Sequence, residues 1–121
     1  MIRPRLSLLS LALPFLLCAP KAFAHAMLVH STPADQAVVH SRSVDLMLDY
    51  NSRIDARRSS LTLTGPGGKT VPIRIQSADK PAELKAFAGN LASGTYRIHW
   101  QVLASDGHIT RGEIAFTVDA R

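Results

Sequence analysis

The segment Ser105-Asp106-Gly107-His108 and the histidine at position 25 are the residues of this chain best suited to hold a metal ion. Residues two apart in extended chain project to the same side, so Asp106 and His108 can present a carboxylate and an imidazole to one ion. Gly107 lets the backbone between them bend without a side-chain clash. Taken alone the signal is weak, because Asp-Gly is common in turns and a lone Asp-x-His is more often a turn with a solvated histidine.

The first 24 residues have the organisation of a secretory signal peptide. Two arginines, at positions 3 and 5, precede an almost wholly apolar run over residues 6–18, and Ala22-Phe23-Ala24 follows as a small-x-small cleavage signal. The apolar run is shorter than the roughly 20 residues that a membrane-spanning helix needs. We therefore expect cleavage after Ala24 and a soluble, exported protein of residues 25–121. Lipidation of Cys18 is disfavoured, because Leu17 stands where lipoprotein signals usually have a small residue.

Cleavage at this point would make His25 the first residue of the protein. An N-terminal histidine offers its α-amine and its ring Nδ1, and the two nitrogens can close one chelate ring on a metal ion. In the uncut chain the same histidine is an ordinary internal residue. The amine and imidazole of His25 can supply the ligands that Asp106 and His108 lack, which favours a metal site over a simple turn.

Composition narrows the classes of function and of ligand. The chain has 14 Lys and Arg against 9 Asp and Glu, and three basic residues belong to the leader, which leaves 11 against 9, or +2. No basic run remains beyond Arg57-Arg58, interpreted as part of a solvated loop, so nucleic-acid binding is not supported. Cys18, the only cysteine, leaves with the leader. A metal site in residues 25–121 must therefore rely on nitrogen and oxygen ligands.

The rest of the sequence is a series of short strand-forming runs separated by turns. Gly65-Pro66-Gly67-Gly68 is a strong turn signal, and Pro72 places the strand that follows it at a sheet edge. The predicted strands cover residues 26–30, 44–50, 60–64, 70–75, 83–88, 95–103 and 112–118, and 95–103 is expected to be central. With no convincing helix, they predict one all-β domain over residues 25–121. It is a small antiparallel two-sheet sandwich, an immunoglobulin-like or cupredoxin-like Greek key of about seven strands.

Four segments together carry a resemblance to a known family. They are His25-Ala26-Met27-Leu28-Val29 with Ser31-Thr32-Pro33-Ala34, Gly94-Thr95-Tyr96-Arg97-Ile98-His99-Trp100, and Ser105-Asp106-Gly107-His108 running into residues 112–118. They resemble the CopC family of periplasmic copper-binding proteins. The likeness covers nearly all of residues 25–121 and is most specific at the two ends. By position it implies one Cu(II) ion per chain, bound by His25, Asp106 and His108.

The chemistry of this ligand set agrees with the resemblance. An amine, two imidazoles and a carboxylate form a nitrogen-rich tetragonal set that suits Cu(II), and copper lies at the top of the divalent affinity series. Zn(II) would also accept these ligands. Because binding needs neutral imidazoles and a deprotonated amine, copper affinity is expected to fall in acid.

Two departures from the family pattern narrow the expected function. Some members carry a methionine-rich segment that forms a separate Cu(I) site, whereas residues 61–75 here contain no methionine, so we expect a protein that binds Cu(II) alone. Only Met27 and Met47 remain after the leader. Ser52 also stands where the family typically has a glutamate near the copper. A support for the N-terminal amine or an axial oxygen is then missing, unless Asp49 or Asp55 substitutes.

Three classes of function follow from these observations. The leading one is a periplasmic Cu(II) carrier or buffer for copper homeostasis or resistance, handing copper to an inner-membrane copper transporter of the CopD type, without catalysis. The second is a copper monooxygenase-like enzyme with an N-terminal histidine site. The third is a metal-free immunoglobulin-like interaction module. For all three classes of function, we expect His30, His40 and His99 to be solvated side chains and Trp100 to be a core residue.

Overall fold

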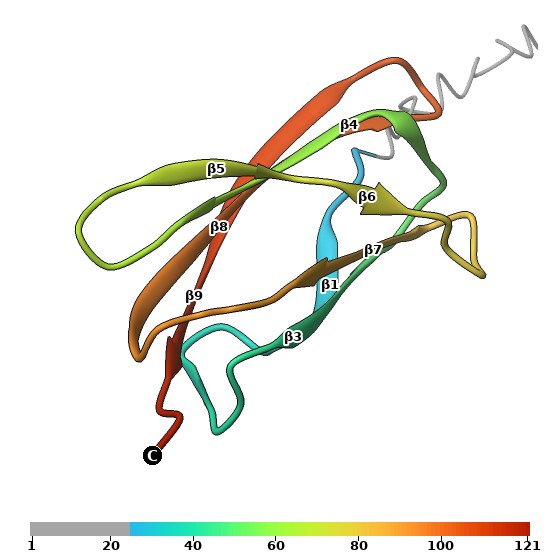
Figure 1. The fold of residues 1–121 in the computed structure, drawn as a ribbon. Coiled ribbons are helices and arrows are strands. Elements are labelled where there is room, and N and C mark those ends of the chain that lie inside the picture. The colour runs from blue at the N-terminus through green and yellow to red at the C-terminus, as the bar shows by residue number, and fades with distance from the viewer. Residues whose placement is uncertain (1–24) are drawn as a thin grey trace, which may run out of the picture.

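The computed structural model describes residues 25–121, and the predicted signal peptide, residues 1–24, lies outside the described residues. Residues 25–121 contain nine strands and no helix, so none of these residues forms a helix able to cross a membrane. The strands are β1 (Leu28–Thr32), β2 (Ala37–Val39), β3 (Val44–Tyr50), β4 (Ile54–Thr64), β5 (Thr70–Ile73), β6 (Ile75–Gln76), β7 (Glu83–Ala88), β8 (Gly94–Ala104) and β9 (Ile109–Val118) (Figure 1).

The strands form two sheets that face each other (Figure 1). One sheet has the order β1-β3-β7-β6 and the other the order β2-β9-β8-β4-β5. Every pairing is antiparallel except the short parallel pairing of β2 with β9. The all-β two-sheet sandwich is therefore confirmed. The prediction of about seven strands was too low, because β2 and β6 have three and two residues and leave little periodic signal.

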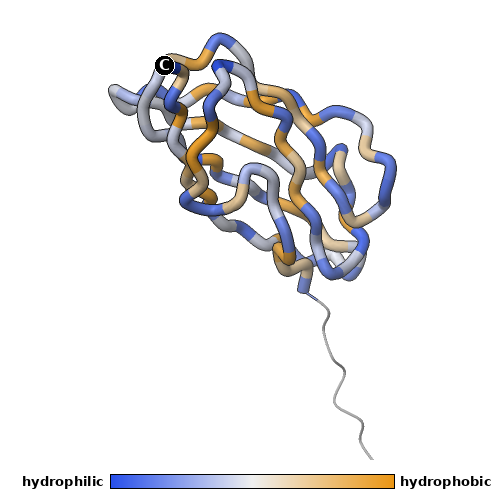
Figure 2. The backbone as a smooth tube through the Cα atoms, turned by 90° about the horizontal axis from the view of Figure 1, so that it is seen from below, coloured by the Kyte–Doolittle hydropathy of each residue, from blue (hydrophilic) through white to orange (hydrophobic). Residues whose placement is uncertain are grey.

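The core forms between the two sheets, from the apolar residues that alternate with polar ones along the strands. This alternation is visible along the chain in Figure 2. In β8 it separates a buried face from an exposed one. Tyr96, Ile98, Trp100 and Val102 are all at most 8% exposed, while the residues between them face solvent or are half-buried. Burial of each such apolar side chain contributes on the order of 1.5–3 kcal/mol. The predicted central strand is thus confirmed, with β8 in the middle of its five-stranded sheet.

Strand boundaries depart from the sequence-based expectations in several places. The first strand begins at Leu28 rather than residue 26, and β9 begins at Ile109 rather than residue 112. The run predicted over residues 70–75 is interrupted at Arg74, and β5 and β6 join different sheets. Pro72 does lie in the edge strand β5, as predicted. β4 is the largest departure: it starts at Ile54 instead of residue 60, because residues 56–59 form a bulge without strand periodicity.

One end of the sandwich gathers three chain segments that are distant in sequence. The Ser105 N–H donates to the carbonyl of Arg53 at 3.1 Å, which joins the β8–β9 turn to the β3–β4 loop. The Asn51 N–H donates to the carbonyl of Met27 at 3.0 Å, which joins the same loop to the segment before β1. This end therefore holds both parts of the predicted metal site.

Candidate metal centre

The segment that carries His25 is fixed to the sandwich by the residues that follow it. Ala26 is 1% exposed and packs in the core, and its carbonyl accepts a hydrogen bond from Thr110 Oγ1 at 2.8 Å. The Met27 N–H donates to Asn51 Oδ1 at 2.8 Å. Because consecutive side chains of an extended segment point to opposite sides, burial of Ala26 directs the exposed His25 away from the core.

A tight turn between β8 and β9 positions the other two residues. The Gly107 N–H donates to the Ala104 carbonyl at 3.0 Å, and the Ala104 N–H donates to the His108 carbonyl at 2.9 Å. Gly107 has φ 86°, in the left-handed region that favours glycine. Asp106 Oδ1 accepts the backbone N–H of His108 at 2.9 Å, so the carboxylate is held by the turn itself.

The structure brings all three predicted residues together. A ligand atom from each of His25, Asp106 and His108 lies within 4.8 Å of the others. The two imidazoles meet edge to face, with centroids 4.9 Å apart and planes at 85°, and His108 Nδ1 lies 3.1 Å from Asp106 Oδ2. All three residues are exposed, so an ion can reach them from solvent. Their role as metal ligands stays a prediction, and the proximity is what that prediction requires.

The turn also prepares Asp106 as an anionic ligand. The backbone N–H of His108 is the main cause that lowers the pKa of the Asp106 carboxyl, with smaller contributions from the imidazoles of His108 and His25. A hydrogen bond to the charged form favours ionisation. The ionised form of Asp106 is therefore favoured, and two imidazole rings face one carboxylate.

The other three histidines lie outside this cluster. His30 Nδ1 is 3.6 Å from Asp49 Oδ2, and His40 Nδ1 is 3.1 Å from the carbonyl of Asp119. His99 points outward from β8, and its Nδ1 is 3.2 Å from Glu113 Oε2. The outward orientation predicted for His99 is confirmed, and its carboxylate partner is an addition that the strand pattern of the sequence did not indicate.

Neither Asp49 nor Asp55 replaces the family's glutamate at the centre. Asp49 lies beside His30, and Asp55 Oδ1 accepts the backbone N–H groups of Arg57 and Arg58 at 3.0 and 3.3 Å. Ser52 Oγ is buried and has no hydrogen-bond partner among residues 25–121. Among residues 25–121, the cluster of possible metal ligands therefore gains no further carboxylate from β3 or β4.

Sequence reasoning missed the residues that support the centre. Thr110 and Asn51 hold the N-terminal segment, and nothing in their local sequence distinguishes them from ordinary strand and turn residues. Behind the segment, the rings of Tyr50 and Trp100 pack at 5.3 Å with an interplanar angle of 73°. Trp100 is 8% exposed, as predicted for a core residue.

Comparison with known proteins agrees with the fold. Residues 28–119 match the CopC domain family. Copper resistance protein C of Xanthomonas campestris pv. juglandis is 34% identical, over 84% of this chain and 86% of that protein. The crystal structure of CopC from Methylosinus trichosporium OB3b is 35% identical with a TM-score of 0.71, covering 78% of this chain and 94% of that one. PcoC from Escherichia coli, a methionine-rich copper resistance protein, is 29% identical with a TM-score of 0.64, covering 79% and 100%. The chain belongs to the CopC family.

Proposed function

We propose that the protein, cut after Ala24, is a periplasmic copper-binding protein that holds one Cu(II) ion through His25, Asp106 and His108. The observation that carries the proposal is the convergence of these residues from the two ends of the domain to within 4.8 Å. Membership of the CopC family and likeness to proteins named for copper resistance support copper as the metal. The protein binds and carries its ion and is not an enzyme.

The ligands favour the oxidised ion. The N-terminal amine, two imidazoles and one carboxylate supply hard and borderline donors that suit tetragonal Cu(II), whereas Cu(I) selects thiolates and thioethers. Met47 lies on β3, in the sheet opposite the β8–β9 turn, and Met27 is a single thioether, 64% exposed, next to the anchored segment. One thioether does not make a soft site, so we assign Cu(II) to the centre.

An exposed site on a rigid scaffold suits a carrier or a buffer. The ligands lie at the surface, where a second protein can approach the ion. Backbone hydrogen bonds within the turn fix Asp106 and His108, and the anchored Ala26 fixes His25. We propose that the protein passes copper to an inner-membrane transporter of the CopD type, in copper homeostasis or resistance. Exchange of an ion between exposed ligand sets requires no opening of the sandwich.

The test is a competitive Cu(II) titration of the protein that begins at His25. Asp106→Ala and His108→Ala should each weaken copper binding by more than roughly 100-fold, beyond what loss of an outer-shell partner costs. His99→Ala is the matched control, because His99 is also exposed and lies next to a carboxylate but outside the centre. Equal copper affinities for all four proteins would refute the assignment of the ligands.

A further inference from the structure

β4 contains a wide bulge close to the metal centre. Asp55 is the partner of Leu103 on β8, and Ser60 is the partner of Gln101, so residues 56–59 lie opposite a single residue, Val102. The bulge thus inserts extra residues into β4 and pushes them away from the plane of the sheet.

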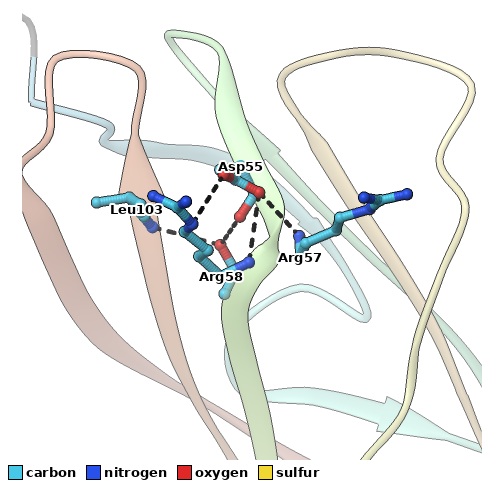
Figure 3. Close-up of polar contacts among 5 residues, drawn as sticks. Asp55, Arg57, Arg58 and Leu103 are labelled. Carbon is cyan, nitrogen blue, oxygen red and sulfur yellow. Dashed lines mark hydrogen bonds and ion pairs between the residues drawn. The ribbon is translucent and has the colours of Figure 1, made fainter.

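Specific hydrogen bonds stabilise the bulge (Figure 3). Asp55 Oδ1 accepts the N–H groups of Arg57 and Arg58. Ser59 Oγ donates to the Asp55 carbonyl at 2.6 Å and accepts the Leu103 N–H at 3.3 Å, which replaces a ladder bond that the insertion interrupts. Because its polar groups are satisfied internally, the bulge is a defined feature of the fold and not the simple solvated loop predicted from the sequence.

The bulge presents two neighbouring arginines to solvent. Arg57 and Arg58 leave the strand on opposite sides, with Arg58 on the side of Leu103 (Figure 3). The Arg58 side chain is 76% exposed, and its Nε lies 3.7 Å from Asp55 Oδ2. Within residues 25–121, Arg57 makes no ion pair shorter than 4 Å. Two guanidinium charges are therefore set against one carboxylate, and the bulge carries net positive charge.

This positive charge lies near the copper ligands. Ile54 pairs with Ala104, and the Arg53 carbonyl accepts the Ser105 N–H, so the start of β4 runs beside the turn that holds the centre. Leu103, level with Asp55, precedes Asp106 by three residues, so the two lie at most about 10 Å apart. That distance is about one Debye length at 0.1 M salt, so charges on the bulge act on a molecule that approaches the centre.

We propose that the Arg57-Arg58 bulge is a docking surface for an acidic partner that exchanges copper with the centre. The inference rests on the proposed function and specifies the kind of partner. Arginine pairs with carboxylates in bidentate geometry and is enriched at interfaces. Complementary charge mainly raises the association rate, which suits a partner that must meet an exposed ion and then leave. The partner therefore carries aspartate or glutamate side chains beside its own copper site.

Two synthetic acceptor peptides test the proposal. Each begins Gly-Gly-His, a Cu(II)-binding amino terminus, and continues with a run of either glutamates or lysines. Copper transfer from the loaded protein is followed by stopped-flow recovery of Trp100 fluorescence at low and high salt. At low salt the acidic peptide should take copper faster than the basic one by about 10-fold, and salt should reduce the difference.

Charge-matched variants localise the effect. Arg57→Ser/Arg58→Ser should remove most of the preference for the acidic peptide and leave equilibrium copper affinity unchanged. Lys69→Ser/Arg121→Ser removes the same charge at the β4–β5 turn and the C-terminus, away from the bulge, and should keep the preference. Equal transfer rates to both peptides, or equal losses in the two double variants, would overturn the docking surface. Absence of Cu(II) binding in the unaltered protein would instead refute the proposed function on which it rests.

Discussion

The imidazole rings of His25 and His108 meet edge to face with their centroids 4.9 Å apart, although the two residues are far apart in sequence. The contact exists because the Thr110 hydroxyl holds the Ala26 carbonyl on one side, and the β8–β9 turn fixes His108 on the other. Two independently anchored segments therefore build the centre. Hydrogen bonds on both sides therefore fix the relative positions of the two imidazoles.

The acid dependence of copper binding should reflect the nitrogen ligands and not the carboxylate. The pKa of Asp106 is lowered, chiefly by the His108 N–H, so this carboxyl stays ionised in mild acid, where protons compete with copper for the nitrogen ligands. Copper affinity of the unaltered protein should therefore fall as the pH decreases from neutral into mild acid. Asp106→Asn keeps an acceptor for the His108 N–H. This variant should bind copper more weakly, and its copper affinity should fall over the same pH range. A pH-independent affinity in Asp106→Asn would contradict this.

The same lowered pKa has a consequence for the metal-free fold. A carboxylate with a depressed pKa stabilises the folded state above its unfolded pKa, about 3.9, and this contribution disappears as pH falls through the folded value. Asp106→Asn should therefore reduce the free energy of unfolding at neutral pH but not in strong acid. Urea denaturation of the two proteins at neutral pH and in strong acid measures this difference in the free energy of unfolding. A constant difference between the proteins across that range would argue against the hydrogen-bonded carboxylate.

Gly107 should be needed both for the turn and for copper. Its φ of 86° is unfavourable for a residue with a branched side chain, so Gly107→Val should cost about 1–2 kcal/mol of stability. Because the turn orients Asp106 and His108, copper affinity should fall by roughly 10-fold as well. Gly107→Asn is the matched variant, since asparagine tolerates this conformation better, and it should lose less stability and less copper affinity. Equal losses in the two variants would contradict this role of Gly107.

Gly112 should be required for packing of the tryptophan. A Cβ at this position of β9 would come within 2.2 Å of Trp100 Cζ2, and the indole is almost fully buried. Gly112→Ala should therefore lower the free energy of unfolding by about 1–3 kcal/mol, as overpacking does. Arg111→Ala, at the neighbouring exposed position, should change it far less. Chemical denaturation followed by far-UV circular dichroism compares the two variants.

The sequence predicted the strands whose two faces differ and missed those without that pattern. β3 and β7 were predicted with their exact bounds, and β8 to within one residue at each end, because apolar and polar residues alternate along β3 and β8 and turns flank all three. β2 has three residues between turns, and the first part of β4 contains two arginines in a bulge. Their positions depend on hydrogen bonds to other strands, which a local pattern does not encode.

The residues of the candidate metal centre could be predicted from the sequence, but the contacts that position them could not. A histidine after a cleavage signal and an Asp-x-His turn indicate metal chemistry through residue type and spacing alone. The buried Ala26, the Thr110 hydroxyl and the Asn51 side chain that orient His25 come from three separate segments. Only the folded arrangement shows that they meet, and the same holds for the proximity of the Arg57-Arg58 bulge to the centre.

Trp100, the only tryptophan of the chain, should report copper binding through its fluorescence. It lies on the strand that leads to Asp106 and packs against Tyr50 behind the N-terminal segment. Cu(II) should quench its emission with one equivalent per chain, whereas Zn(II), which has a filled d shell, should quench it little. Quenching that continues well past one equivalent would contradict a single site.

If cleavage after Ala24 creates the metal site, copper affinity must depend on the position of the amino terminus. Cu(II) is titrated into the protein that begins at His25 and into one that begins at Ala19, with Trp100 fluorescence and a competing chelator as readouts. The first protein should have one tight site. Binding to the second should be weaker by roughly 100-fold or more, because its amine no longer chelates together with the His25 ring. Equal affinity in the two proteins would show that the free amine of His25 is not a ligand.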